Sequence, residues 1–275
     1  MRINISLSSL FERLSKLSSR SIAITCGVVL ASAIAFPIIR RDYQTFLEVG
    51  PSYAPQNFRG YIIVCVLSLF RQEQKGLAIY DRLPEKRRWL ADLPFREGTR
   101  PSITSHIIQR QRTQLVDQEF ATRELIDKVI PRVQARHTDK TFLSTSKFEF
   151  HAKAIFLLPS IPINDPLNIP SHDTVRRTKR EIAHMHDYHD CTLHLALAAQ
   201  DGKEVLKKGW GQRHPLAGPG VPGPPTEWTF LYAPRNEEEA RVVEMIVEAS
   251  IGYMTNDPAG KIVENAKSGH HHHHH

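Results

Sequence analysis

An uncharged run of nineteen residues, 21–39, limits the fold of this chain more than any other feature of the sequence. Its residues are all apolar or small, and arginines flank it at Arg20 and Arg40. At the helical rise, a run of this length just crosses a hydrocarbon core of about 30 Å. The run therefore predicts a single membrane-spanning helix near the N-terminus.

Cleavage and orientation of this segment are separate questions. The small residues at 31–35 would also suit a signal peptidase, but the run is longer than the usual signal core of about 7 to 15 residues, so we expect an uncleaved anchor. Basic residues lie on both sides, so the positive-inside rule gives no orientation. After the run there are two cysteines and no Asn-x-Ser/Thr acceptor. These features favour a single-pass membrane protein whose folded part faces the cytosol.

The overall charge indicates no particular partner, whereas the histidines are concentrated in one part of the sequence. The formal net charge is +7, but basic and acidic residues are intermixed and no nucleic-acid-binding motif is present, so we expect no nucleic-acid partner. Residues 268–275 are a linker and a six-histidine expression tag, which we exclude. Of the nine other histidines, five lie between His184 and His214. This enrichment belongs to the protein itself.

The first part of the body shows mainly helical patterns. Residues 42–59 contain two prolines and predict an irregular lead-in. The apolar stretch 61–70 is too short to span a bilayer and predicts a buried helix. Residues 83–112 predict loops and short helices, whereas apolar residues at three- and four-residue spacing predict a helix over 117–137, kinked at Pro131.

The second part of the body shows strand patterns. Apolar and polar residues alternate over 148–158, which predicts a strand, and four prolines then predict a long loop. A strand at 192–198 followed by Asp201 and Gly202 predicts a hairpin that returns through Val205.

A further strand is predicted at 228–232, and Asn236 with Glu239 predicts a helix start. These elements indicate an α+β fold with a mostly antiparallel sheet and packed helices. We divide the chain into three regions. They are an anchor segment (1–41), a mainly helical region (42–140) and an α+β catalytic region (141–267).

Histidines and carboxylates are concentrated in the run from Glu181 to His194. In one unbroken strand, four of these residues would share a face. They are His184, His186, Asp190 and His194. Asp187 and His189 would take the other face. Three imidazoles with a carboxylate suit a transition metal, or direct acid–base chemistry near neutral pH. A single histidine of this kind is often merely solvated, but that does not account for the whole group.

Several short motifs resemble the fungal luciferases. They are Glu181-x-Ala-His184-x-His186, Asp190-x-Thr-x-His194, Gly209-Trp210-Gly-Gln-Arg213-His214-Pro-Leu216 and Tyr232-Ala-Pro-Arg235 before a Glu-rich helix start. The resemblance includes the N-terminal anchor and covers residues 1–267. It implies a membrane-bound oxygenase that oxidises the luciferin 3-hydroxyhispidin with O2 through an endoperoxide-like intermediate. The products would be CO2, an oxyluciferin (caffeylpyruvic acid) and green light, with a membrane-bound hispidin hydroxylase nearby.

The same resemblance suggests roles for individual residues. The catalytic candidates are Glu181, His184, His186, Asp187, His189, Asp190 and His194. The enzyme must remove the luciferin hydroxyl proton, and histidine is suited to this. Candidates for binding the flat substrate and its developing anion are Trp210, Arg213, His214, Trp228, Tyr232 and Arg235.

No phosphate-binding or dinucleotide-binding glycine motif is present, and we expect no cofactor besides the co-substrate O2. We expect no bound metal either. Two alternatives remain. One is a metal-dependent oxygenase with His184, His186 and His194 as ligands. The other is a membrane-tethered module that binds a partner and senses pH through its histidines.

Overall fold

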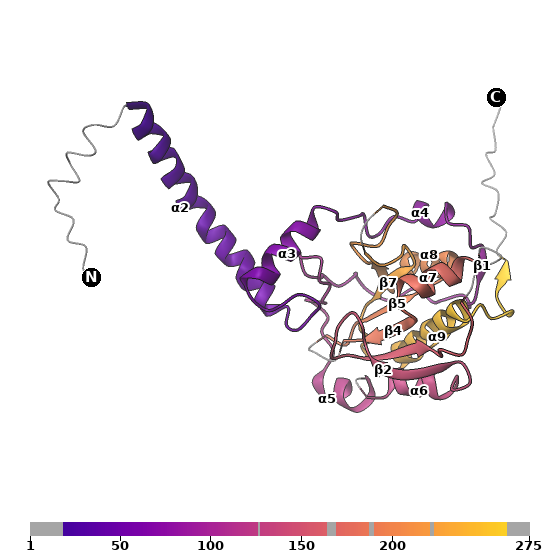
Figure 1. The fold of residues 1–275 in the computed structure, drawn as a ribbon. Coiled ribbons are helices and arrows are strands. Elements are labelled where there is room, and N and C mark those ends of the chain that lie inside the picture. Colours follow the sequence, from indigo (N-terminus) through magenta and orange to yellow (C-terminus); the bar gives the residue numbers. More distant parts are fainter. Residues whose placement is uncertain (1–18, 126, 164–168, 187–189, 221–222, 263–275) are drawn as a thin grey trace, which may run out of the picture. The chain divides into compact units, whose positions relative to one another are not determined.

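The computed structural model describes residues 19–125, 127–163, 169–186, 190–220 and 223–262 (Figure 1). Contacts divide the chain into two compact units, Met1–Glu48 and Val49–His275. The expected division of the body between residues 140 and 141 stays a prediction.

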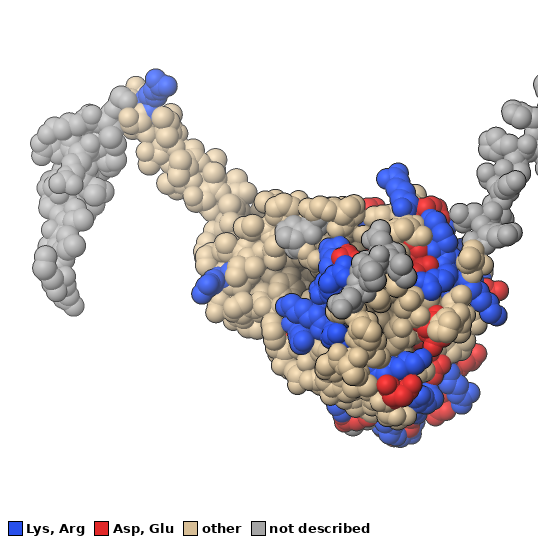
Figure 2. Space-filling model, turned by 45° about the vertical axis from the view of Figure 1, so that its right-hand side comes forward, with Lys and Arg blue, Asp and Glu red and all other residues tan. Residues whose placement is uncertain are grey.

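The first unit contains helix α2, Ser19–Glu48. Its most apolar stretch has a mean hydropathy of 2.4 and is not buried, so its length and composition suit a membrane span. Figure 2 shows few charged side chains along it. The helix continues past residue 42, so the predicted irregular lead-in is wrong in its first part. It ends just before Gly50, whose φ of 81° is the left-handed conformation that often terminates helices.

The second unit is built on a six-stranded antiparallel sheet, which confirms the α+β prediction. In spatial order its strands are β2 (Thr141–Thr145), β3 (Lys153–Leu157), β4 (Glu181–Met185), β5 (Leu193–Ala196), β7 (Trp228–Leu231) and β6 (Gly211–Arg213). A separate pair of short strands joins β1 (Arg87–Arg88) to β8 (Lys261–Ile262). On the face seen in Figure 2, acidic and basic side chains are intermixed over this unit.

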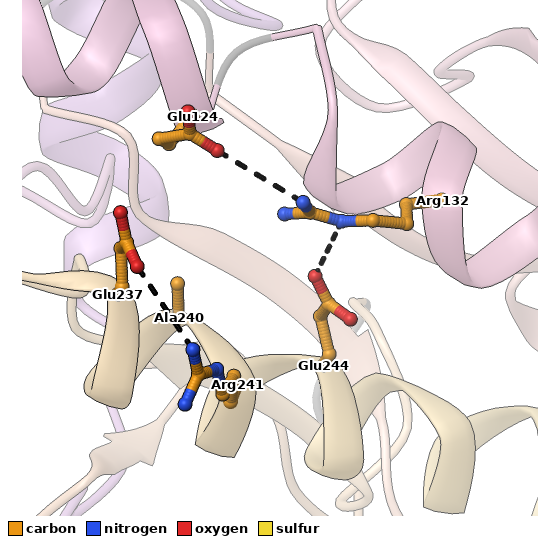
Figure 3. A pocket seen from close by; sticks show the side chains of 6 residues that line it. All are labelled: Glu124, Arg132, Glu237, Ala240, Arg241 and Glu244. Atoms are coloured by element: carbon orange, nitrogen blue, oxygen red, sulfur yellow. Dashed lines mark ion pairs between the residues drawn. The ribbon is translucent and has the colours of Figure 1, made fainter.

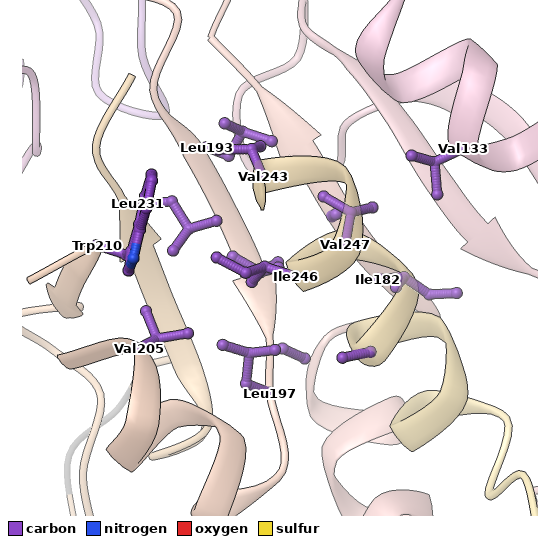
Figure 4. Close-up of a cluster of buried hydrophobic side chains, with 14 of the residues drawn as sticks. Val133, Ile182, Leu193, Leu197, Val205, Trp210, Leu231, Val243, Ile246 and Val247 are labelled. Carbon is purple, nitrogen blue, oxygen red and sulfur yellow. The ribbon is translucent and has the colours of Figure 1, made fainter. Parts of the chain in front are cut away.

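Helix α9 (Glu237–Met254) covers one face of the sheet and forms the centre of the core. The side chain of Asn236 caps it by accepting from the Glu239 amide, as predicted. Figure 4 shows Ile246 of α9 among apolar side chains of the central strands. Three further helices contact α9 or the sheet. They are α6 (Val129–Ala135), α7 (Pro170–Arg177) and α8 (Ala199–Lys207).

Two elements differ from their predicted bounds. The helix predicted over 117–137 is divided into α5 (Gln118–Phe120), a π-helix (Ala121–Leu125) and α6. Pro131 lies in the first turn of α6, where its missing amide is tolerated, so the interruption comes before the proline. The strand predicted over 148–158 begins only at β3, and its partner β2 was not predicted.

The predicted hairpin at Asp201 and Gly202 is wrong, because both residues lie inside helix α8. The Asp201 carboxylate accepts from the backbone amides of Trp89 and Leu90 at 3.0 and 3.1 Å, a tertiary role that does not require a turn. A Cβ atom at Gly202 would meet the ring of Tyr80 at 3.0 Å, so close packing of the helix explains the glycine.

Helix α3 (Phe58–Ser68) forms where an apolar helix was predicted, but the prediction that it is buried is wrong. Asn57 caps it, accepting from the Gly60 amide at 3.1 Å. One face of the helix packs on the unit, while the other is exposed and apolar. A sequence that is apolar all round has no periodicity that distinguishes the two faces. A short helix, α4 (Ala78–Asp81), follows.

Candidate active site

The histidines lie on one face of the sheet, in a row that crosses several strands. His184 of β4 pairs in register with His194 of β5, and His194 pairs with Phe230 of β7. Residues paired in register point to the same face, so the three rings are neighbours. The ring centroids of His184 and His194 are 5.3 Å apart, and those of His194 and Phe230 are 5.2 Å apart. The cluster thus forms across a hairpin, and not along one unbroken strand.

A β-bulge brings Glu181 to the same face as His184. In a regular strand these residues, three apart, would point in opposite directions. Here Ile155 pairs with Ala183 and Phe156 pairs with Glu181, so one residue of β4 is left without a partner on β3. The bulge re-aims the Glu181 side chain, as such irregularities do at many functional sites.

Glu181 fixes the orientation of the His184 ring. Its carboxylate lies 2.6 Å from Nδ1 of His184 and also accepts from the Ser146 hydroxyl at 2.8 Å and the Lys147 amide at 2.7 Å. An ionised carboxylate can only accept, so Nδ1 carries a hydrogen and the neutral ring has its lone pair on Nε2. That Nε2 is buried and has no hydrogen-bond partner within the described part of the chain. His184 therefore has the arrangement of a general base.

His186 is held by a second chain of hydrogen bonds. Its Nδ1 lies 2.8 Å from the Thr192 hydroxyl, which donates to the Asp190 carboxylate at 2.8 Å. The hydroxyl hydrogen is used for Asp190, so His186 is the donor to Thr192. A guanidinium nitrogen of Arg110 lies 3.3 Å from each of the two ring nitrogens of His186. Burial and the Arg110 charge keep the pKa of His186 well below its usual value, so this ring is neutral.

Arg110 forms a buried ion pair with Glu149, with a separation of 2.8 Å. Burial raises the pKa of Glu149, but attraction to the Arg110 guanidinium brings it below the ordinary value. Because His186 is neutral, Arg110 is the positive charge responsible. Arg110 also donates to the carbonyls of Gln109 and Pro51, so it connects two loops to the histidine row.

His194 and His214 complete the cluster, with ring centroids 5.2 Å apart. The His194 ring lies parallel to Trp228 at 6.1 Å, and its buried Nδ1 has no hydrogen-bond partner among the described residues. Burial and the neighbouring histidines lower the pKa of His194 well below its usual value. Nδ1 of His214 accepts from the Leu216 amide at 3.1 Å, so Nε2 of the neutral ring is a donor.

A cavity of about 280 Å³ lies over this row and is lined by His184, His194, His214 and Trp228. Loops distant in the sequence and the ends of helices α3 and α7 supply the rest of its walls. Their residues are Tyr53, Leu67, Ile108, Gln109, Lys147, Phe148, Glu149, Arg177, Leu216, Gly223 and Pro224. Apolar walls with a few convergent polar groups are typical of sites for small organic ligands. The cavity therefore suits a small organic ligand.

A second cavity, of about 260 Å³ beside α9, has different chemistry (Figure 3). Arg132 there bridges Glu124 and Glu244, at 3.9 and 2.8 Å. Arg241 pairs with Glu237 at 3.9 Å. Both arginines are thus paired with carboxylates, and no histidine is among the described residues that line this space, so its lining differs from that of the histidine cavity.

Two of the aromatic residues predicted to bind substrate do not line the histidine cavity. Trp210 packs among the core residues around α9 (Figure 4) and donates to the Pro94 carbonyl at 2.8 Å. Tyr232 is fully buried and donates to Gln212 at 2.9 Å. Both side chains support the fold behind the site.

The two predicted arginines also have other partners. Arg213 donates to the carbonyl of Glu73, and Arg235 forms an ion pair with Glu239. Neither arginine lines the histidine cavity, so the structure does not bring them to the site. Asp187 and His189 lie outside the described residues.

Four buried residues around the histidines were not predicted: Arg110, Ser146, Glu149 and Thr192. Thr192 lies inside the histidine run, and its place midway between the candidates Asp190 and His194 could have marked it. The other three come from loops far away in the sequence, and no local pattern identifies them.

The stability of the site depends on pH through His214. Burial lowers the pKa of this ring to about 3 in the folded protein, whereas the unfolded chain has the ordinary value of about 6.5. Between these values only the unfolded chain binds the proton, so stability falls as the pH falls below about 6.5. In this range the unfolded state gains about 1.4 kcal/mol per pH unit from protonation of His214. His214→Asn keeps an acceptor for the Leu216 amide and should abolish this contribution to the pH dependence of the folding stability.

The measurement is the thermal midpoint of the detergent-solubilised chain at several pH values. The midpoint of the unchanged protein should fall relative to that of the variant by about 3–5 °C per pH unit in this range. Parallel curves for the two proteins would show that His214 is not neutral in the folded state.

Comparison with known proteins places this site inside a described family. A model of the Luciferase domain matches residues 179–250, a segment that contains the catalytic candidates. The luciferase of Armillaria mellea is 79% identical over 255 residues, which are 92% of this chain and 96% of that protein.

Two other luciferases are similarly close. That of Armillaria ostoyae is 82% identical over 238 residues, covering 86% of this chain and 90% of the relative. That of Armillaria gallica is 80% identical over 241 residues, covering 88% and 91%. No solved structure matches the chain.

Proposed function

This chain belongs to the fungal luciferases, and we propose from that premise that it oxidises 3-hydroxyhispidin with O2 in the histidine cavity. The observation that carries the proposal is His184, which lines the cavity. Glu181 holds its Nδ1, and its buried Nε2 has no other partner among the described residues. This is the geometry that proton removal from an acidic hydroxyl group requires.

The first step is transfer of the luciferin hydroxyl proton to Nε2 of His184. The resulting imidazolium is stabilised by the Glu181 carboxylate, and the substrate becomes an electron-rich enolate. Ground-state O2 reacts with such an anion to form a peroxide, which closes to an endoperoxide. His184 returns the proton as the endoperoxide loses CO2, which leaves caffeylpyruvic acid in an excited state that emits green light.

The cavity walls fit the other requirements of this reaction. Nε2 of His214 is a donor for a substrate oxygen, and Lys147 and Arg177 line the cavity with positive charge that attracts an anion. Trp228 and Phe148 supply aromatic surface for a flat styrylpyrone and exclude water from the intermediate. We propose no cofactor besides O2.

Location is part of the proposal. Helix α2 would hold the chain in the endoplasmic reticulum membrane as a single-pass anchor, with the cavity on the cytosolic side. A membrane-bound hispidin hydroxylase nearby would then supply a poorly soluble luciferin without its passage through water.

A metal-dependent oxygenase is the second candidate, because three ring nitrogens converge. Ligand atoms of His184, His186 and His194 all lie within 4.8 Å of one another. The Glu181 and Thr192 hydrogen bonds to the first two rings resemble the outer partners that orient metal-bound histidines. A metal bound there would activate O2 or the substrate as a Lewis acid. We favour direct acid–base chemistry, because Nε2 of His184 is suited to it without further groups.

One emission assay tests both candidates. Tag-free protein, 3-hydroxyhispidin and air are mixed in a luminometer, before and after exhaustive treatment with a chelator, and the product is identified by mass. We expect green light, caffeylpyruvic acid and the same rate in both samples. Darkness in both samples would overturn the proposed function. Loss of light only after chelation, with recovery on adding one metal, would establish the second candidate.

A further inference from the structure

Helix α3 exposes a continuous apolar face. The exposed large apolar side chains on α3 and just after it are Phe58, Ile62, Ile63, Val66, Leu69 and Phe70. With 3.6 residues per turn these positions fall on one side of the helix. Gly60, Tyr61 and Val64, on the other side, are buried. Leu69 is the most exposed of the set, at 81%.

A face of this kind is unusual for a surface in contact only with water. Single exposed apolar residues are common, but a contiguous group on one helix marks a binding surface. The surrounding charges indicate what it binds. Arg59 and Arg71 are the only charged residues in the segment 49–72, which lies between Glu48 and Glu73, and both are exposed. Exposed apolar side chains with an arginine near each end of the helix are complementary to a phospholipid surface.

The covalent chain favours the same partner. Nine residues separate the end of α2 at Glu48 from the start of α3 at Phe58. This connection can extend over about 35 Å at most. If α2 crosses a membrane, α3 is tethered within that distance of one end of the membrane-spanning helix. The apolar face and the membrane anchor are therefore neighbours along the chain.

The same helix also reaches the cavity. Leu67, at the edge of the packed side of α3, lines the histidine cavity together with Tyr53 from the segment before the helix. We propose that the exposed face of α3 docks into the headgroup region of a phospholipid bilayer and thereby places the cavity mouth at the membrane surface. An apolar luciferin would then enter from the lipid. This entry route rests on the proposed function, whereas docking does not.

Docking is tested by the quenching of tryptophan fluorescence in the full chain. The protein is reconstituted into phosphatidylcholine vesicles that contain a minor share of phosphatidylserine and lipids brominated near the headgroup. Leu69→Trp places the reporter on the proposed surface. Ile262→Trp is the matched control, an exposed apolar residue on β8, the yellow strand paired with β1 far from α3 (Figure 1). The native tryptophans contribute equally to both variants.

We expect the brominated lipids to quench the added fluorescence of Leu69→Trp several-fold more strongly than that of Ile262→Trp. Equal quenching would overturn docking, because the apolar face would then meet something other than a bilayer. This measurement needs no light emission, so its result is independent of the luciferin.

The entry route has its own test. Leu69→Glu should raise the KM for luciferin dissolved in vesicles several-fold and leave kcat unchanged, because Leu69 does not line the cavity. With luciferin delivered in detergent micelles, the two proteins should have the same KM. An unchanged KM in vesicles would overturn entry from the lipid. Absence of light from the unmodified chain would instead be a failure of the proposed function.

Discussion

Replacing His184 by asparagine should lower the rate of light emission by about 10²- to 10⁴-fold, the usual contribution of a general base. The asparagine amide can still donate to Glu181, so the buried carboxylate keeps a partner while the proton acceptor is lost. We therefore expect a thermal midpoint close to that of the unchanged protein. Emission at saturating luciferin and thermal unfolding, measured on the same preparation, check both parts of this prediction.

A matched control and a rescue experiment separate catalysis from structure. His137, which does not line the cavity, should tolerate substitution by glutamine with little loss of light. In His184→Ala, added imidazole should restore part of the emission, because it supplies a base in the vacated space. If His184→Asn kept more than about a tenth of the normal rate, the residue would not be the base.

The histidine cluster shows how far sequence patterns can define a site. The even spacing of His184, His186 and His194 predicts a shared face, and the structure does bring these rings together. They meet because β4 and β5 form a hairpin in which His184 and His194 pair in register. Period-two spacing alone cannot distinguish one long strand from two strands joined by a turn. The three histidines of the cluster were therefore predictable, but the hairpin that brings them together was not.

Glu181 was predicted from its motif, but its contact with His184 depends on a bulge. The extra residue in β4 becomes visible only when the pairing with β3 is known. Arg110 and Glu149 were not predictable at all, because their segments reach the site through tertiary contacts. Trp210 and Arg235 were expected at the substrate because they lie in recognisable motifs, yet in the structure they contact other parts of the fold.

Local sequence patterns gave wrong predictions where residues contact parts of the fold that are distant in the sequence. Asp201 and Gly202 form a common turn sequence, but here they belong to a helix that packs against Tyr80. Helix α3 was predicted from its apolar composition, but its exposure was not. Hydrophobicity indicates that a surface avoids water, and does not say whether protein or lipid covers it.

Replacing Arg110 by methionine should destabilise the folded protein by about 3–5 kcal/mol, because it leaves the buried Glu149 carboxylate without its guanidinium. For a chain of this size, the thermal midpoint should fall by about 6–20 °C. Arg241→Met is the matched control. Arg241 pairs with Glu237 on the surface, where 78% and 65% of the two side chains are exposed. Such a pair contributes about 0–1 kcal/mol, so its loss should hardly change the midpoint.

The double variant Arg110→Met/Glu149→Met shows whether the stability lost in Arg110→Met comes from the unpaired Glu149 carboxylate. Removal of both charges leaves no unpaired ion, so most of the lost stability should return. Its emission should nevertheless stay low, because the loops that Arg110 fixes through the Gln109 and Pro51 carbonyls lose their anchor beside His186. Equal midpoints for Arg110→Met and Arg241→Met would contradict a buried pair. A double variant as unstable as the single one would instead show that Arg110 acts through its carbonyl contacts, and the ion pair would then contribute little to stability.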